Sequence, residues 1–196
     1  MLYILLKYLL APFFYLLCRP IIIGKRHLYI KGKVIFVCNH ISMLDPVMLA
    51  MFSPRHIHFM AKAELFHHWY MRIFFRGLLA FPVNRNQADM QSMKKALKVL
   101  DQGKAFGIFP EGKRTITDSM DDLEKGAAFL AIRSSAPVIP VYIKRDSYTN
   151  LHFEMAVGTP LRVSDIVATT SKSQLVDVVT DEISDSIQAL RAQIEK

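Results

Sequence analysis

The chain has 196 residues, 52% of them hydrophobic, and a formal net charge of +8. This length suits one domain with a substantial core. The basic charge favours anionic partners such as phospholipid headgroups, phosphorylated metabolites or nucleic acid. No run of five Lys or Arg residues and no nucleic-acid motif occurs, so nucleic acid ranks below membrane and phosphate. Cys18 and Cys38 lie in apolar surroundings, which is typical of buried thiols in a reducing compartment.

The first 23 residues are strongly apolar and predict membrane contact. They lack a basic start and a small-residue cleavage site, so they do not resemble a secretory signal. Their length suits a spanning helix, but Lys7 and Pro12 interrupt the run and Arg19 with Pro20 closes it. We therefore expect two short apolar pieces that insert into one leaflet, with a true span or a core helix as alternatives. The chain then divides into a membrane-associated helical segment, 1–24, and one further domain, 25–196.

The rest of the chain alternates short apolar runs with amphipathic stretches. The expected strands cover 34–38, 55–60, 78–83, 104–109, 137–143 and 151–157. The expected helices cover 46–52, 64–76, 87–102, 123–133 and 171–194. This alternation predicts an α/β fold with a mixed central sheet flanked by helices.

The loop after the first of these strands holds a His and an Asp five residues apart, His40 and Asp45. Sites in open α/β sheets form at strand ends. A carboxylate at the start of the next helix can accept a hydrogen bond from one ring nitrogen and leave the other as a base. The pattern therefore predicts a general base held by a carboxylate. The alternative is a polar loop in which Asp45 only caps the helix and His40 is incidental.

A second polar segment, 109–115, follows the apolar run that ends at Phe109. Its Pro and Gly predict a sharp turn, and Arg114 can grip a phosphate with two hydrogen bonds. Glu111 can orient that cation or bind a substrate hydroxyl, and Gly112 shapes the turn. Arg85 is a further candidate, because it follows another strand-like run. A solvated surface turn is the alternative for 109–115.

Four ordered blocks of this sequence resemble the glycerolipid acyltransferase family. They are N-H-x4-D at Asn39, His40 and Asp45; the stretch Gly77 to Arg85; F-P-E-G-x-R-T at Phe109 to Thr115; and V-I-P-V at Val138 to Val141. Two accessory patterns also match, K-x-E-L from Lys62 and K-G-A from Lys125. The small size and short apolar start resemble the bacterial 1-acyl-sn-glycerol-3-phosphate acyltransferases of that family.

The resemblance implies transfer of a fatty acyl group from acyl-CoA or acyl carrier protein to lysophosphatidic acid, which gives phosphatidic acid. His40 would be the general base and Asp45 its orienting carboxylate. The implied phosphate-binding residues are Lys62, Arg85 and Arg114, with Glu111 and Gly112 shaping the site. No cofactor or metal is implied. The expected location is the cytoplasmic face of the inner membrane, where acyl thioesters are found.

Several other interpretations stay open at this point. The acceptor could be another lysolipid, such as a lyso-ornithine lipid, or the protein could bind anionic lipid without catalysis. Cys38, on the same strand face as His40, could act as a nucleophile. Pairs of histidines at 56 and 58 and at 67 and 68 could hold a metal, although no Cys or carboxylate pattern supports it. The choice between the two acyl donors is not readable from the residues.

Overall fold

The structure is a computed structural model that describes residues 2–84, 89–112, 123–149 and 152–195. Its helices are α1 (Leu2–Cys18), α2 (Asp45–Phe52), α3 (Trp69–Gly77), α4 (Met90–Asp101), α5 (Gly126–Ser134), α6 (Val163–Thr169) and α7 (Leu175–Ile194). Short 3-10 helices are η1 (Lys25–Tyr29), η2 (Ala63–Phe66) and η3 (Arg145–Tyr148). The strands are β1 (Ile21–Ile23), β2 (Val34–Cys38), β3 (Ile57–Lys62), β4 (Ala80–Val83), β5 (Ala105–Ile108), β6 (Val138–Ile143) and β7 (Glu154–Val157).

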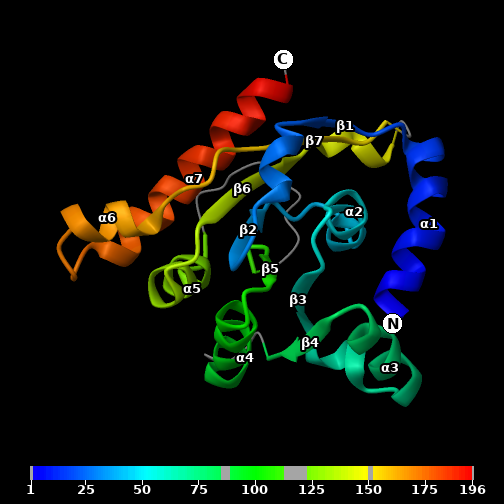
Figure 1. Cartoon of the computed structure of the whole chain (residues 1–196), viewed down its shortest axis with the longest axis horizontal. Helices are drawn as coiled ribbons and strands as arrows, with labels where there is room; N and C mark the ends of the chain where they lie inside the picture. Colours follow the sequence, from blue (N-terminus) through cyan, green and yellow to red (C-terminus); the bar gives the residue numbers. More distant parts are fainter. Residues whose placement is uncertain (1, 85–88, 113–122, 150–151, 196) are drawn as a thin grey trace.

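The described strands form one sheet in the order β1-β7-β6-β2-β5-β3-β4 (Figure 1). All neighbours run parallel except β6 and β7, which are antiparallel. All residues of β2 and β6 are buried, as the continuous apolar runs VIFVC and VIPVYI require of central strands covered on both faces. The predicted α/β fold with a mixed sheet flanked by helices is therefore confirmed.

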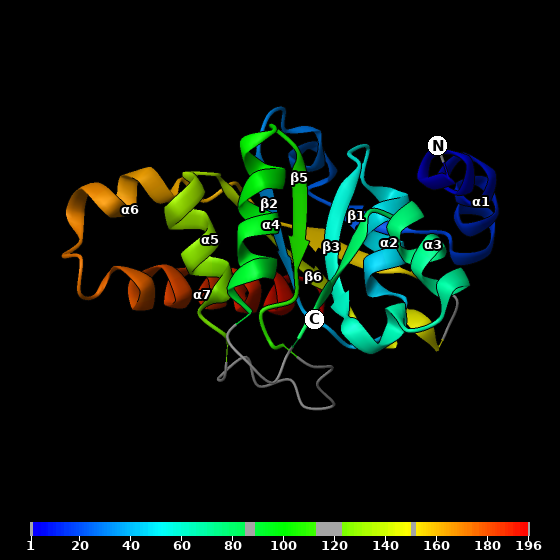
Figure 2. The same cartoon turned by 90° about the horizontal axis from the view of Figure 1, so that it is seen from below.

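Helices cover both faces of the sheet, with α4, α5 and α7 on one side and α1 and α2 on the other (Figures 1 and 2). Each face has its own apolar core. One core joins Ile35 and Val37 of β2 to α4, α5 and α7. The other joins Phe36 of β2 to α1 and α2. Successive side chains of β2 therefore pack into opposite cores, and this packing fixes the carboxyl end of the strand between them.

The N-terminal segment is one helix, so the expectation of two separate apolar pieces is wrong. Helix α1 continues through Pro12, and its buried face packs against α2. Tyr3 and Cys18 are buried against the core. The Lys7 ammonium donates to the carbonyls of Ser53 and Arg55. Among the described helices, none has both the length and the apolar character needed to cross a membrane.

Other boundaries differ from the sequence pattern by a few residues. The end of the apolar segment 1–23 forms an unexpected edge strand, β1, parallel to β7. The expected helix 64–76 is divided into η2 and α3. The expected strand 55–60 is displaced to β3, and α6 lies in a stretch for which no helix was expected. Short elements carry too few periodic residues for their ends to be readable from the pattern.

Candidate active site

The two polar segments predicted from the sequence lie at the same edge of the sheet. Strands β2 and β5 are parallel neighbours, with Val37 opposite Ile108. Their carboxyl ends therefore bring the loop from Asn39 to Leu44 beside Phe109 and the turn after it. The His40 backbone N–H donates to the Glu111 carboxylate at 3.2 Å, which ties one loop directly to the other.

His40 and Asp45 form the predicted pair. The Nδ1 atom of His40 lies 2.8 Å from Oδ2 of Asp45. The Asp45 side chain is fully buried, and only 12% of the His40 side chain is exposed. A buried carboxylate that takes three other donors acts as an acceptor, so the bonded Nδ1 carries the proton. The ring therefore presents the lone pair of Nε2, as a general base requires.

Asp45 does not cap helix α2, so the alternative interpretation of this residue is not supported. The helix N-cap is Leu44, one residue earlier than expected, and it makes no side-chain cap bond. The Asp45 carboxylate turns back and accepts from the backbone N–H groups of Ile41 and Ser42 at 2.7 and 2.8 Å. These hydrogen bonds hold the loop against the carboxylate and keep the His40 ring beside it.

The His40 ring is also held from its face. The Phe109 ring stacks on it with centroids 4.4 Å apart and an interplanar angle of 28°. Phe109 stacks in turn on Phe59 of β3 at 6.2 Å. Asn39 fixes the start of the loop, because its amide donates to the Ile143 carbonyl at 2.9 Å and accepts from the Ile143 N–H at 2.7 Å. These contacts fix the orientation of the His40 ring in the substrate-free protein.

Cys38 is poorly suited to act as a nucleophile. Its thiol is completely buried. Burial, with smaller contributions from the charges of Asp45 and Glu111, raises the pKa of the Cys38 thiol well above its usual range. The thiolate is the reactive species, so this environment keeps the residue inert.

The remaining predicted site residues differ in position. Glu111 is buried at the junction of the loops, and Gly112 adopts a φ of +63° close to the Glu124 carboxylate. Lys62 lies at the end of β3, more than half exposed, and pairs with Glu64 at 3.1 Å. Arg85 and Arg114 lie outside the described residues.

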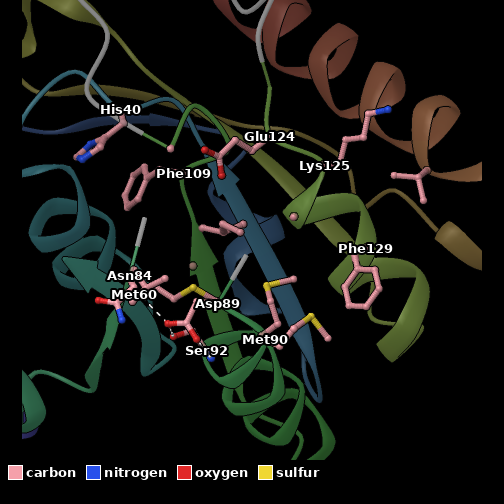
Figure 3. A pocket seen from close by; sticks show the side chains of 17 residues that line it. His40, Met60, Asn84, Asp89, Met90, Ser92, Phe109, Glu124, Lys125 and Phe129 are labelled. Carbon is pink, nitrogen blue, oxygen red and sulfur yellow. Dashed lines mark hydrogen bonds between the residues drawn. The ribbon is translucent and has the colours of Figure 1, made fainter. Parts of the chain in front are cut away.

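A cavity of about 470 Å³ opens beside His40 (Figure 3). Its apolar lining comes from β3, the end of β5, α4, α5 and α7, and includes Met60, Met90, Met93, Phe109, Phe129 and Val176. Polar groups are Asn84, Asp89, Ser92, Glu124 and Lys125. An apolar cavity with a few convergent polar groups is the usual form of a small-molecule site. The lining of this cavity is mostly apolar.

The metal interpretation finds no geometric basis in the part of the chain that the structure describes. There, no three His, Cys, Asp or Glu side chains are grouped closely enough to hold a metal ion. His56 instead packs edge-on against the Tyr3 ring, with centroids 5.1 Å apart.

Sequence reasoning missed two residues of the site. Tyr148 in η3 donates its hydroxyl to Oδ1 of Asp45 at 2.6 Å, although the two residues are 103 positions apart. Phe109 belongs to a sequence motif, but nothing in that motif indicates that its ring stacks on His40. Tyr148 follows β6, and β6 lies next to β2 in the sheet, so the strand order explains why Tyr148 reaches Asp45. That strand order is not readable from the sequence pattern.

Comparison with known proteins agrees with this geometry. A family model described as "Acyltransferase" matches residues 19–144. A 1-acyl-sn-glycerol-3-phosphate acyltransferase of Bacillus subtilis is 28% identical over 179 residues, 88% of each chain. A protein of the same name from Borreliella burgdorferi is 23% identical over 88% of this chain and 73% of its own.

A solved structure has a similar fold. The crystal structure of the 1-acyl-sn-glycerophosphate (LPA) acyltransferase PlsC from Thermotoga maritima matches with a TM-score of 0.71. The match covers 95% of this chain and 81% of that one at 18% identity. The resemblance noted from the ordered blocks is confirmed: the chain belongs to the acyltransferase family and is an enzyme of the O-acyltransferase class.

Proposed function

We propose that this enzyme transfers a fatty acyl group from an acyl thioester to the sn-2 hydroxyl of lysophosphatidic acid and forms phosphatidic acid for phospholipid biosynthesis. The observation that carries the proposal is a buried His40–Asp45 pair whose histidine lines a largely apolar cavity. The names of the relatives support lysophosphatidic acid as the acceptor.

His40 acts as the general base in this proposal. Its Nε2 takes the proton of the acceptor hydroxyl as the oxygen attacks the thioester carbonyl. Asp45 stabilises the imidazolium that forms, and the proton then passes to the departing thiol. Positioned proton transfer of this kind contributes typically about 10²–10⁴-fold to a rate. A thioester is already activated, so no acyl-enzyme on Cys38 and no cofactor is needed.

The cavity receives the acyl chain of one substrate, because most of its lining is apolar. The phosphate of the acceptor is assigned to Arg85, Arg114 and Lys62. Arg85 follows the cavity residue Asn84 directly in sequence, and Arg114 follows the cavity residue Gly112 by two positions. Glu111 and Gly112 shape the turn that precedes Arg114 in sequence. Acyl-CoA and acyl carrier protein both fit as donors.

We place the enzyme on the cytoplasmic face of the inner membrane, inserted into one leaflet. The N-terminal end of α1 lies beside α3, with Leu2 packed over Gly77 (Figure 1). Both expose large apolar side chains, including Leu9, Leu16, Trp69, Ile73 and Phe74. Arg72 and Arg76 add positive charge on α3. Aromatic side chains beside basic ones are typical of surfaces that sit at headgroup level.

Acyl transfer by the purified protein in detergent tests the function. Lysophosphatidic acid is supplied with a long-chain acyl-CoA or acyl carrier protein, and wild type is compared with His40→Ala. The exposed His152 provides a matched control, His152→Ala. Phosphatidic acid from wild type and His152→Ala but not from His40→Ala supports the proposal. Product only with another lysolipid, such as a lyso-ornithine lipid, would change the acceptor. Equal activity of His40→Ala would refute the mechanism.

A further inference from the structure

The two oxygens of the Asp45 carboxylate are used in different ways. Oδ2 accepts from His40 Nδ1 and from the backbone N–H groups of Ile41 and Ser42. Oδ1 accepts from the Tyr148 hydroxyl at 2.6 Å. The carboxylate is completely buried, so water does not stand in for a lost donor on either side. The orientation of the carboxylate therefore depends on a residue outside the loop that holds His40.

Tyr148 is itself held firmly. Its ring packs edge-on against Phe153 with centroids 6.0 Å apart, and Phe153 contacts Phe52 of α2 at 5.0 Å. The neighbouring Ser147 hydroxyl donates to the Glu154 carbonyl and accepts from the Glu154 N–H, which fastens η3 to β7. The hydroxyl thus reaches Asp45 from η3, which is packed and hydrogen-bonded outside the loop that holds His40.

The hydroxyl stays protonated under all working conditions. Burial, and then the negative charge of Asp45, raises the pKa of Tyr148 far above its usual range. Other titratable groups near this pair are His40, which bonds the same carboxylate, and the thiols of Cys38 and Cys18, whose electrostatic effect on the pKa of Tyr148 has the same direction. The Tyr148 hydroxyl is therefore available as a donor to the Asp45 carboxylate.

We propose that Tyr148 is a positioning residue of the acyl transfer. Its hydroxyl fixes Oδ1 of Asp45, so that Oδ2 stays on Nδ1 of His40 and the ring keeps Nε2 directed at the acceptor hydroxyl. The kinetic part of this inference rests on the proposed function, whereas the structural part does not.

The test removes one hydroxyl in each of two variants. Tyr148→Phe keeps the ring against Phe153 and deletes only the bond to Asp45. Tyr142→Phe is the matched control, because Tyr142 is also a buried tyrosine whose hydroxyl donates to a carboxylate, that of Glu195, away from the site. We expect Tyr148→Phe to lower kcat roughly 10- to 100-fold, the worth of a hydrogen bond to a charged group, with KM for both substrates nearly unchanged. Tyr142→Phe should leave kcat unchanged.

Two further measurements distinguish positioning from general support of the fold. In an Asp45→Ala background, which has no carboxylate left for the Tyr148 hydroxyl to hold, Tyr148→Phe should cause less than about a threefold further loss, because residues that act as a unit are not additive. A structural role would give the same loss in both backgrounds. Independently of activity, ¹⁵N spectra of the His40 ring report which nitrogen carries the proton. We expect a single Nδ1–H tautomer in wild type and Tyr142→Phe, and a tautomer mixture in Tyr148→Phe.

Each outcome bears on the inference. An unchanged His40 tautomer in Tyr148→Phe, or wild-type kcat in that variant, would overturn it and leave the proposed function intact. Absence of acyl transfer by wild type would overturn the proposed function, while the tautomer measurement would still decide whether Tyr148 orients Asp45.

Discussion

Replacing Asp45 separates two effects that the structure joins in one side chain. Asp45→Asn keeps the shape and removes the charge. Its amide oxygen can take the three donors now on Oδ2, and its amide nitrogen can donate to the Tyr148 oxygen. Asp45→Ala removes the acceptors altogether. The first variant therefore tests the electrostatics of catalysis, and the second tests the support of the loop.

The magnitudes come from the four hydrogen bonds of the carboxylate. The alanine variant leaves donors on His40, Ile41, Ser42 and Tyr148 without their acceptor. Leaving a buried donor unpaired costs about 1–3 kcal/mol each, but Ile41 and Ser42 are only partly buried, so water can replace part of what their N–H groups lose. We therefore expect a loss of about 3–5 kcal/mol in the free energy of unfolding, comparable to breaking a buried ion pair. Domains have about 5–15 kcal/mol in total, so this loss is severe.

The asparagine variant should behave differently. Its four hydrogen bonds persist, so we expect the free energy of unfolding to fall by no more than about 1 kcal/mol. Its neutral side chain no longer stabilises the His40 imidazolium. We expect kcat to fall roughly 10²–10³-fold, within the range of general-base catalysis, while KM for the donor stays near the wild-type value.

Urea unfolding followed by circular dichroism measures the first quantity, and acyl transfer in detergent measures the second. The reasoning requires the two variants to diverge, with Asp45→Ala losing stability and Asp45→Asn losing turnover. Asp45→Asn within threefold of wild-type kcat would refute the electrostatic role of the carboxylate. Asp45→Ala as stable as wild type would refute its role in holding the loop.

Three further predictions concern the cavity, a helix cap and the membrane face. Asp89 caps α4 and accepts from the Ser92 hydroxyl and from the backbone N–H groups of Asn84, Ser92 and Gln91, and these bonds lower its pKa to about 2. Its contribution to stability is therefore present above pH 3.8 and lost as pH falls toward about 2; Asp89→Asn should remove this pH dependence in urea unfolding. Met93→Trp, which fills the cavity, should lower the rate with long-chain relative to short-chain acyl-CoA by about tenfold or more. Leu9→Ser with Leu16→Ser should abolish sedimentation with anionic vesicles and keep activity in detergent; retained sedimentation would contradict the membrane proposal.

The fold was largely predictable because its central strands are continuous apolar runs. The strands expected at 34–38 and 137–143 match β2 and β6 within one residue at either end. The N-terminal segment was not predictable in the same way. Pro12 in a bare sequence predicts interruption, and only the packing of α1 against α2 shows why the helix continues.

The site was partly predictable because both polar segments come directly after strands, and the loops that leave parallel strands gather at one edge of the sheet. His40, Asp45, Glu111 and Gly112 lie together for that reason. Tyr148 was not predictable, because it comes after β6, whose place beside β2 is a property of the strand order. Local pattern thus indicates the residues within each loop, while topology alone indicates which loops meet.

Helix α2 connects the proposed membrane helix to the proposed base. Asp45 begins α2, and the carbonyls of Ser53 and Arg55 lie just beyond its carboxyl end. The buried Lys7 ammonium of α1 donates to both carbonyls, where a cation is favoured by the helix dipole. Removing α1 would leave those carbonyls without a donor and uncover the apolar side of α2. Activity lost on truncation of α1 would therefore not establish a need for membrane binding, whereas activity lost only on vesicles after changes at its exposed side chains would.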